Sequence, residues 1–321
     1  MRTADEFRRF YESELARDLE VMEAERKTRL RRLLVAGLVV VSAATVAVLL
    51  GGAGRFGLSR FVWLSGVWVI AGVLLFVAWL FLGPEDFRSD FKRKVVGGIA
   101  KFIDPGLEYN ERGLVTLERF VASRLFDARI ERFRAEDHVG GTLGKTALEF
   151  AEVRTEVDDG SGKRTRPLFH GLFLTADFNK DFHGVTRVLP NETWMKVANW
   201  ALAAALRASG RPEERIRLES VEFDALFAVY SDDQVEARYI LSPSLVEEIV
   251  AYRKKTGRRL RLSFVRSCVH LAIPYERDLF EPRFFRSVLD FGQALVFFVD
   301  LSLAASVVED LHLNTRIWTK A

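Results

Sequence analysis

Two long stretches of the chain carry no charged side chain. They cover residues 33–54 and 61–83, and both consist mainly of Leu, Val, Ala, Phe, Gly and Trp. A helix needs about 20 apolar residues to cross a hydrocarbon core of about 30 Å. The link between the stretches is short and rich in glycine. The pattern therefore predicts two transmembrane helices that run antiparallel as a hairpin.

Basic residues lie on the outer side of both apolar stretches. The residues before the first stretch are Arg26, Lys27, Arg29, Arg31 and Arg32, and those after the second are Arg88, Lys92, Arg93 and Lys94. The link itself carries only Arg55 and Arg60. Because basic residues are retained on the cytoplasmic side, both termini and the whole region after the hairpin are expected to be cytoplasmic.

Amphipathic segments flank the hairpin. Residues 1–32 place apolar side chains at three- and four-residue steps against a densely charged face, which predicts a cytoplasmic helix. This helix either packs on the soluble domain, continues the first span into the cytoplasm, or binds a partner or a second copy. Residues 84–106 predict a juxtamembrane helix that Asp104-Pro105-Gly106 ends. It either lies along the inner leaflet or leads the chain away from the membrane.

Residues 107–321 show mixed periodicity and predict one soluble domain. The expected helices are 114–126, 192–209, 223–230, 243–252 and 284–311. The expected strands are 130–133, 148–157, 167–175, 184–189, 216–219, 237–241, 260–265 and 268–274, with a hairpin turn at 158–162 and another around Arg266-Ser267. Strands and helices do not alternate strictly, so the predicted fold class is α+β with a mixed, largely antiparallel sheet. Asp290, Asp300 and Glu309 interrupt the last helix, which favours a core or docking helix over a third span.

Composition narrows the class of protein. Charged residues make up 28% of the 321 residues, which is too many for a polytopic transporter. The net charge is only +3, so basic character acts in local patches. The single cysteine, Cys268, excludes an internal disulfide and fits a reducing compartment.

The densest carboxylate group is Asp232, Asp233 and Glu236. Such oxygens suit a hard cation, but their spacing fits no EF-hand. Arg238 is close enough in sequence to neutralise one of them. We therefore expect a structural role, in which the acids cap a turn and pair with Arg238, with a metal or catalytic site as the weaker alternative.

Recognised metal and nucleotide motifs are absent from the sequence. The five histidines show no HxxxH or HExxH spacing, although His170 and His183 bracket a predicted hairpin and could approach each other. The glycine-rich residues 140–145 lack the spacing of a phosphate-binding loop. We expect no cofactor.

The strongest basic cluster after the hairpin lies between Arg253 and Arg261. No aromatic residues are interleaved for base stacking, so nucleic acid is not expected, and the alternatives are anionic lipid or solvated surface. The residues expected to contact anionic headgroups are Arg88, Lys92, Arg93, Lys94, Lys254, Lys255, Arg258 and Arg259.

Two segments carry a resemblance to a known family. LFHGLFLTADFNKDFHGVTRVLP, from residue 168, and FDALFAVYSDDQVEARYILSPSLVEEI, from residue 223, are similar to the bacterial DUF3137 family. The resemblance extends over most of residues 85–321 and the leading helix. It implies a membrane protein of the bacterial cytoplasmic (inner) membrane without an assigned activity, and a LemA-like membrane protein as a partner. It supplies no catalytic residue.

These observations favour a membrane-anchored cytoplasmic scaffold or interaction module without enzymatic activity. The alternative is an enzyme or a small-ligand or metal sensor with a site around Asp232–Arg238. Homo-oligomerisation stays open.

Overall fold

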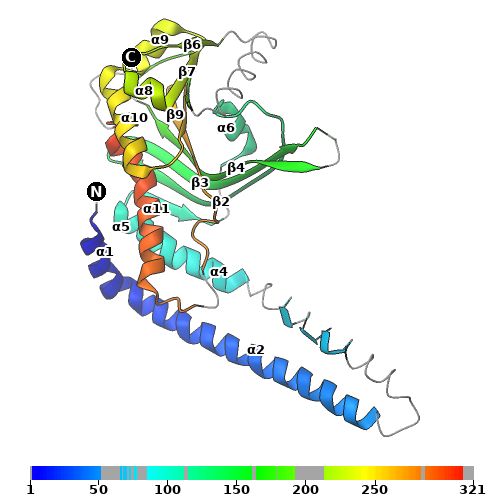
Figure 1. Ribbon diagram of the computed structural model, residues 1–321. Coiled ribbons are helices and arrows are strands. Elements are labelled where there is room, and N and C mark those ends of the chain that lie inside the picture. Colours follow the sequence, from blue (N-terminus) through cyan, green and yellow to red (C-terminus); the bar gives the residue numbers. More distant parts are fainter. Residues whose placement is uncertain are drawn as a thin grey trace. The chain divides into compact units, whose positions relative to one another are not determined.

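The structure is a computed structural model that describes most of the chain (Figure 1). The chain divides into two compact units. The described residues are 2–51, 66, 68–70, 72, 73, 76, 77, 85–111, 115–160, 164–178, 180–191, 213–282 and 286–313. Unit 1 comprises residues 1–7, 95–281 and 294–321, and unit 2 comprises residues 8–94 and 282–293. Each unit is described by itself.

The described residues of unit 1 form a nine-stranded sheet in which neighbouring strands pair antiparallel. The strand order is β1-β2-β3-β4-β9-β8-β5-β7-β6. The strands are β1 (Leu107–Asn110), β2 (Ile130–Leu143), β3 (Thr146–Asp158), β4 (Thr165–Asp177), β5 (Val185–Pro190), β6 (Glu214–Ile216), β7 (Phe227–Ser231), β8 (Arg261–Val265) and β9 (Cys268–Pro274). This sheet confirms the α+β class and its antiparallel character.

Tight turns set the register of two hairpins. Gly144 joins β2 to β3 with φ 64°, a left-handed conformation that glycine adopts without strain. Arg266 and Ser267 join β8 to β9 with φ 51° and 57°, the turn geometry that matches the twist of paired strands. The second hairpin was predicted from sequence. The glycine-rich residues 140–145 therefore form a strand end and a hairpin turn.

One face of the sheet is covered by the short helix α6 (Leu117–Ala122). The Thr116 hydroxyl caps this helix by accepting the Arg119 N–H. Phe120 packs with Phe169 and Phe173 of β4 in an apolar cluster. Because side chains alternate along a strand, residues 152, 154 and 170 lie on the opposite face.

Residues 221–240 correct two predictions. The expected helix 223–230 is a helix, α8 (Val221–Leu226), followed at once by β7, whose residues are all buried. The expected strand 237–241 is instead α9 (Gln234–Ile240). A short apolar run is compatible with a buried strand as well as with a helix. Residues 227–231 form a strand because they pair with β5 and β6. The predicted helix 192–209 lies outside the described residues.

Two further helices complete unit 1. α10 (Pro243–Thr256) starts at the predicted Ser242-Pro243 and ends at Gly257, which has φ 64°. α11 (Phe291–Asp310) is shorter than the expected 284–311. Asp300 is buried in it and binds the Tyr275 hydroxyl at 3.1 Å and the Arg277 guanidinium. These partners are those of a docked core helix.

Within the described part of the chain, α11 is also the one helix whose length and apolar composition would allow it to cross a membrane. Of its most apolar window, 61% is buried. A mostly buried core helix passes the same test, so this finding agrees with the predicted docking role.

Unit 2 contains the leading helix from Arg8 onward and its continuation. Helical backbone runs from α1 (Ala4–Phe10) through a π-helical turn, η1 (Tyr11–Leu15), into α2 (Ala16–Gly51). Within unit 2, the buried Glu23 accepts the Arg26 guanidinium at 2.7 Å and the Val288 N–H at 3.1 Å. These contacts favour the packed-helix interpretation of residues 1–32.

Residues 84–106, for which a juxtamembrane helix was expected, are helical over Glu85–Ile103. This helical stretch consists of α4 (Glu85–Phe91), the π-helical turn η2 (Lys92–Val96) and α5 (Gly97–Ile103), and Asp104 ends it with extended backbone.

The two apolar segments meet inside unit 2. α2 carries the first segment as helix up to Gly51, and the described residues among 66–77 are helical. A β-carbon added to Gly72 would lie 2.9 Å from Val40 Cγ1, and one added to Gly37 would lie 3.3 Å from Phe76 Cε2. The small residues therefore allow close helix approach. Most of the link and both ends of the second apolar segment lie outside the described residues.

Candidate functional site

A polar group occupies the sheet face opposite α6. Glu152 and Arg154 are two residues apart on β3, and Arg154 is the register partner of His170 on β4. Asp278 reaches them from the loop that follows β9. Three separate chain segments thus bring an imidazole, two carboxylates and a guanidinium together.

The His170 Nε2 atom is the centre of this group. It lies 2.8 Å from Glu152 Oε1 and 3.5 Å from Asp278 Oδ1. The Leu279 N–H donates to the other Glu152 oxygen at 2.7 Å, so this carboxylate is fixed in place. Burial raises the pKa of Glu152, against the lowering effect of its bond to His170.

Arg154 supplies a cation to the same group. Its Nη2 binds Asp278 Oδ1 and lies 3.3 Å from His170 Nε2. About half of the Arg154 side chain is exposed (48%), as is that of Asp278 (55%). The group is therefore closed on the Glu152 side and open to solvent on the Asp278 side.

A second acidic group borders the first. Carboxylate oxygens of Glu136, Asp137 and Glu281 lie within 4.8 Å of one another. Asp137 is buried with φ 55° at a β-bulge in β2, and the Tyr109 hydroxyl donates to it at 2.5 Å. Burial, followed by the charge of Asp137, raises the pKa of Tyr109. A bulge of this kind re-aims side chains and here turns Asp137 into the protein.

Sequence reasoning missed the Glu152, His170 and Asp278 group. His170 was considered with His183, but β9 and β8 lie between β4, which carries His170, and β5, which follows His183. The sequence signal is faint: Glu152, Arg154 and His170 occupy alternate positions on two strands. Asp278 is brought in by tertiary structure alone.

The predicted carboxylate group around residue 232 is present, with backbone partners. Asp232 Oδ1 accepts the Val185 N–H at 2.7 Å. Glu236 accepts the N–H groups of His183 and Gly184 at 2.8 and 2.6 Å. Asp233 caps α9 by accepting the N–H groups two and three residues ahead, at 2.8 and 2.9 Å. The expected capping role matches this geometry.

The expected role of Arg238 does not match. Arg238 is exposed in α9, and within the described residues no hydrogen bond or ion pair involves it. The expectation assumed a strand at 237–241. In a helix, positions 236 and 238 point about 200° apart, so Arg238 turns away from Glu236.

The basic residues that follow the second apolar segment divide into exposed and buried ones. Arg88, Arg93 and Lys94 are exposed. Lys92 is 1% exposed, which corrects its expected place in a lipid contact. Its position in a helix explains this, because Phe91 and Val95 on neighbouring positions are buried as well.

The cluster from 253 to 261 is engaged by protein groups. Lys254 pairs with Glu222, and Lys255 pairs with Asp310 at 2.9 Å. The Arg258 guanidinium lies 3.9 Å from the centre of the Tyr275 ring. Arg259 is exposed. This arrangement favours the alternative in which the cluster is protein surface.

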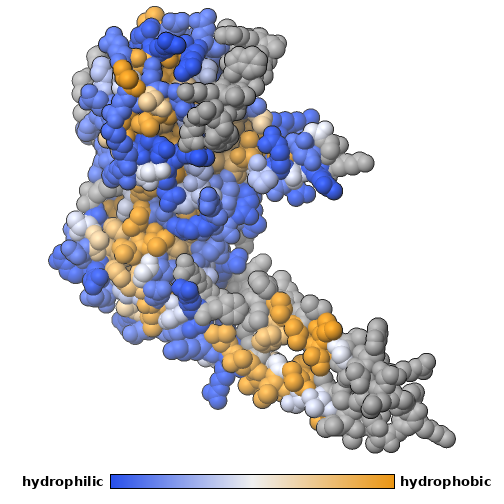
Figure 2. Space-filling view, viewed as in Figure 1, coloured by the Kyte–Doolittle hydropathy of each residue, from blue (hydrophilic) through white to orange (hydrophobic). Residues whose placement is uncertain are grey.

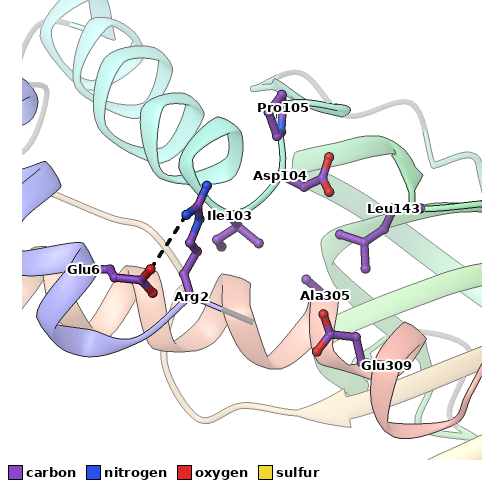
Figure 3. A pocket seen from close by; sticks show the side chains of 9 residues that line it. Arg2, Glu6, Ile103, Asp104, Pro105, Leu143, Ala305 and Glu309 are labelled. Carbon is purple, nitrogen blue, oxygen red and sulfur yellow. Dashed lines mark ion pairs between the residues drawn. The ribbon is translucent and has the colours of Figure 1, made fainter.

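A hollow of about 480 Å³ lies elsewhere in unit 1 (Figure 3). Its labelled side chains come from the N-terminus and α1, the end of α5 and the two residues after it, the last residue of β2, and α11. Glu6, Asp104 and Glu309 line it together with Arg2, and Arg2 pairs with Glu6 at 3.8 Å. With three carboxylates against one guanidinium, its lining is acidic.

The fold defines this chain as an α+β protein with a nine-stranded antiparallel sheet and a long helical N-terminal region. Residues 167–313 match the model of DUF3137, described as a protein of unknown function. The match confirms the resemblance, over a shorter stretch than expected.

No curated protein matches the sequence significantly. Among solved structures, the crystal structure of the mycobacterial trehalose monomycolate transport factor A, TtfA, is similar. The two share 12% identity, the match covers 70% of this chain and 97% of that chain, and the TM-score is 0.33. A likeness this distant carries no argument about function.

Proposed function

We propose that the protein is a membrane-anchored interaction module, with a helical hairpin in the bacterial cytoplasmic membrane and the sheet domain in the cytoplasm. The observation that carries this proposal is the exposed apolar surface of the two packed helices in unit 2. The exposed large apolar residues of the first helix are Leu34, Val35, Leu38, Val39, Val40, Val41 and Val46, and those of the second segment are Trp68, Val69, Ile70, Val73 and Val77.

An apolar surface of this kind requires lipid or another protein. Figure 2, coloured by hydropathy, shows apolar residues gathered on the surface of α2. Water-exposed patches on soluble monomers rarely exceed a few hundred Å². Both apolar segments are also free of charged residues over the length that a transmembrane helix needs. A lipid bilayer is therefore the environment that best covers this apolar surface.

The chemistry of unit 1 supports interaction rather than catalysis at residues 232–238. Asp232, Asp233 and Glu236 are occupied with backbone N–H groups, which leaves them few open oxygens for a substrate. The partner that the family resemblance suggests is a LemA-like membrane protein. A second copy of this chain is the alternative.

Membrane integration is tested by extraction of the protein from membranes. The full chain should resist extraction by alkaline carbonate and dissolve only in detergent. A variant with Leu38→Arg and Val41→Arg should become extractable, because each central arginine costs about 3 kcal/mol of insertion. Its matched control, Leu38→Ala with Val41→Ala, should stay in the membrane.

Reporter fusions address the orientation. A fusion after residue 92 should give a cytoplasmic signal, and one within residues 51–54 should give a periplasmic signal. Release of the wild-type chain by carbonate would refute the anchor. The opposite pattern of reporter signals would refute the cytoplasmic placement.

A further inference from the structure

We propose that Glu152, His170 and Asp278 form a binding site for a divalent first-row transition metal ion. The site lies on the face of the β3–β4 pair opposite α6. It is independent of the membrane anchor, so its test and that of the anchor succeed or fail separately.

The spacing of the donor atoms fits one ion. The ligands of a tetrahedral ion with bonds of about 2.1 Å are about 3.4 Å apart. His170 Nε2 and Asp278 Oδ1 are 3.5 Å apart, and His170 Nε2 and Glu152 Oε1 are 2.8 Å apart. All three donor atoms lie within 4.8 Å of one another. An opening of about half an ångström between Glu152 and His170 therefore admits the ion.

His170 Nε2 lies between an acceptor, Glu152 Oε1 at 2.8 Å, and a donor, Arg154 Nη2 at 3.3 Å, so a single protonation state hydrogen-bonds with only one of them. With a proton on Nε2, its N–H donates to Glu152, and Arg154 donates to Asp278 instead. An unprotonated Nε2 accepts from Arg154 but then faces the Glu152 oxygen at 2.8 Å with no proton between them. A metal ion bound to the unprotonated Nε2 and to both carboxylates satisfies all three groups.

The surroundings already have features of a supported site. The Leu279 N–H fixes one oxygen of Glu152 and leaves Oε1 directed at Nε2, which is the way outer partners orient metal ligands. Asp278 lies on the open side, so water can complete the coordination. Arg154 occupies that side as a competing cation, and its half-exposed side chain is able to swing into solvent.

The donor set selects the class of metal. One imidazole nitrogen with two carboxylate oxygens suits Zn²⁺, Mn²⁺ or Fe²⁺. Mg²⁺ and Ca²⁺ prefer oxygen ligands alone and should bind poorly here. Zn²⁺ is the practical probe, because it has no redox chemistry.

The test is calorimetric titration of ZnCl₂ into the full chain in detergent, after chelator treatment and removal of any purification tag. The wild type should bind one Zn²⁺ per chain. His170→Ala and Asp278→Asn should weaken binding by at least the 10–100-fold seen for lost outer partners. His183→Ala is the matched control, since His183 is an exposed histidine just before β5, three strands away from β4, and it should bind as the wild type does.

Arg154→Gln separates a metal site from an ion-pair network. It removes the competing cation, so Zn²⁺ affinity should rise. Thermal melts complete the test: Zn²⁺ should raise the wild-type melting temperature but not that of Asp278→Asn, whose exposed position keeps the fold intact without metal. Absence of zinc binding in the wild type would overturn the proposal. So would equal binding by His170→Ala, which would indicate an adventitious ion elsewhere, or weaker binding by Arg154→Gln.

Discussion

Arg187 is the side chain whose removal should destabilise the sheet domain most. It lies on β5 and is fully buried. Its Nε donates to Glu213 at 2.7 Å, and its Nη1 pairs with Asp127. Burial raises the pKa of Glu213, while Arg187 opposes that rise. Replacing Arg187 with Leu would leave two carboxylates in a poorly solvated place without their cation.

The size of the effect follows from this burial. The Arg187 side chain is 1% exposed, and its partners Asp127 and Glu213 are 15% and 7% exposed. Removing one partner of a buried ion pair costs about 3–5 kcal/mol, whereas an exposed pair contributes under about 1. For a domain of roughly 200 residues, each kcal/mol lowers the melting temperature by about 2–4 °C. Arg187→Leu should therefore lower it by about 6–20 °C.

The assay is thermal unfolding of the full chain in detergent, followed by tryptophan fluorescence. Arg238→Ala is the matched control, since it deletes an exposed arginine without an ion pair among the described residues, and should change stability by under about 0.5 kcal/mol. Combining Arg187→Leu with Glu213→Leu should recover part of the loss, because an apolar pair replaces one stranded charge. A melting temperature for Arg187→Leu within 2 °C of the wild type would refute the reasoning, since roughly 1 kcal/mol is all that such a shift allows.

Three further outcomes are expected. Gly184→Ala should destabilise the chain by about 1–3 kcal/mol in the same melts, because the added β-carbon would lie 2.5 Å from Glu236 Oε2 and 2.6 Å from Asp232 Oδ1. An unchanged melting temperature would show that these side chains move aside without cost. The Arg26 hydrogen bond lowers the pKa of Glu23 to about 2. The ionised Glu23 therefore stabilises the folded state fully above pH 4.5, and this contribution is lost as the pH falls toward 2. The free energy of unfolding should thus fall more steeply below pH 4.5 for the wild type than for Glu23→Gln. The same pH dependence in both proteins would show that the Glu23–Arg26 pair does not contribute to stability. Changing the exposed Arg88, Arg93 and Lys94, which follow the second apolar segment in sequence, to Gln should reduce retention of anionic lipid in nanodiscs. Lys254→Gln with Lys255→Gln should not, because these lysines are far along the chain from the apolar segments and pair with Glu222 and Asp310. Equal retention by all variants would leave neither set in contact with headgroups.

Periodicity alone located most elements, because alternation and helical spacing reflect which side of an element faces the core. The β8–β9 hairpin, the end of α5 at Asp104 and the start of α10 at Ser242-Pro243 were all predicted, since turn and capping residues act locally. Even the capping by Asp233 needed only its neighbours in sequence.

Long-range contacts decided the rest. β7 became a strand because β5 and β6 offer hydrogen bonds on both sides, and α9 became a helix once Asp233 capped it. Arg238 then pointed away from the acids it was expected to neutralise. The meeting of Glu152, His170 and Asp278 depends on the β3–β4 register and on the return of the chain after β9, over a hundred residues beyond Glu152 in sequence. Local sequence determines which residues form helices, turns and apolar spans, but the partners of a buried charge are set by which strands pair, and only the tertiary structure holds that information.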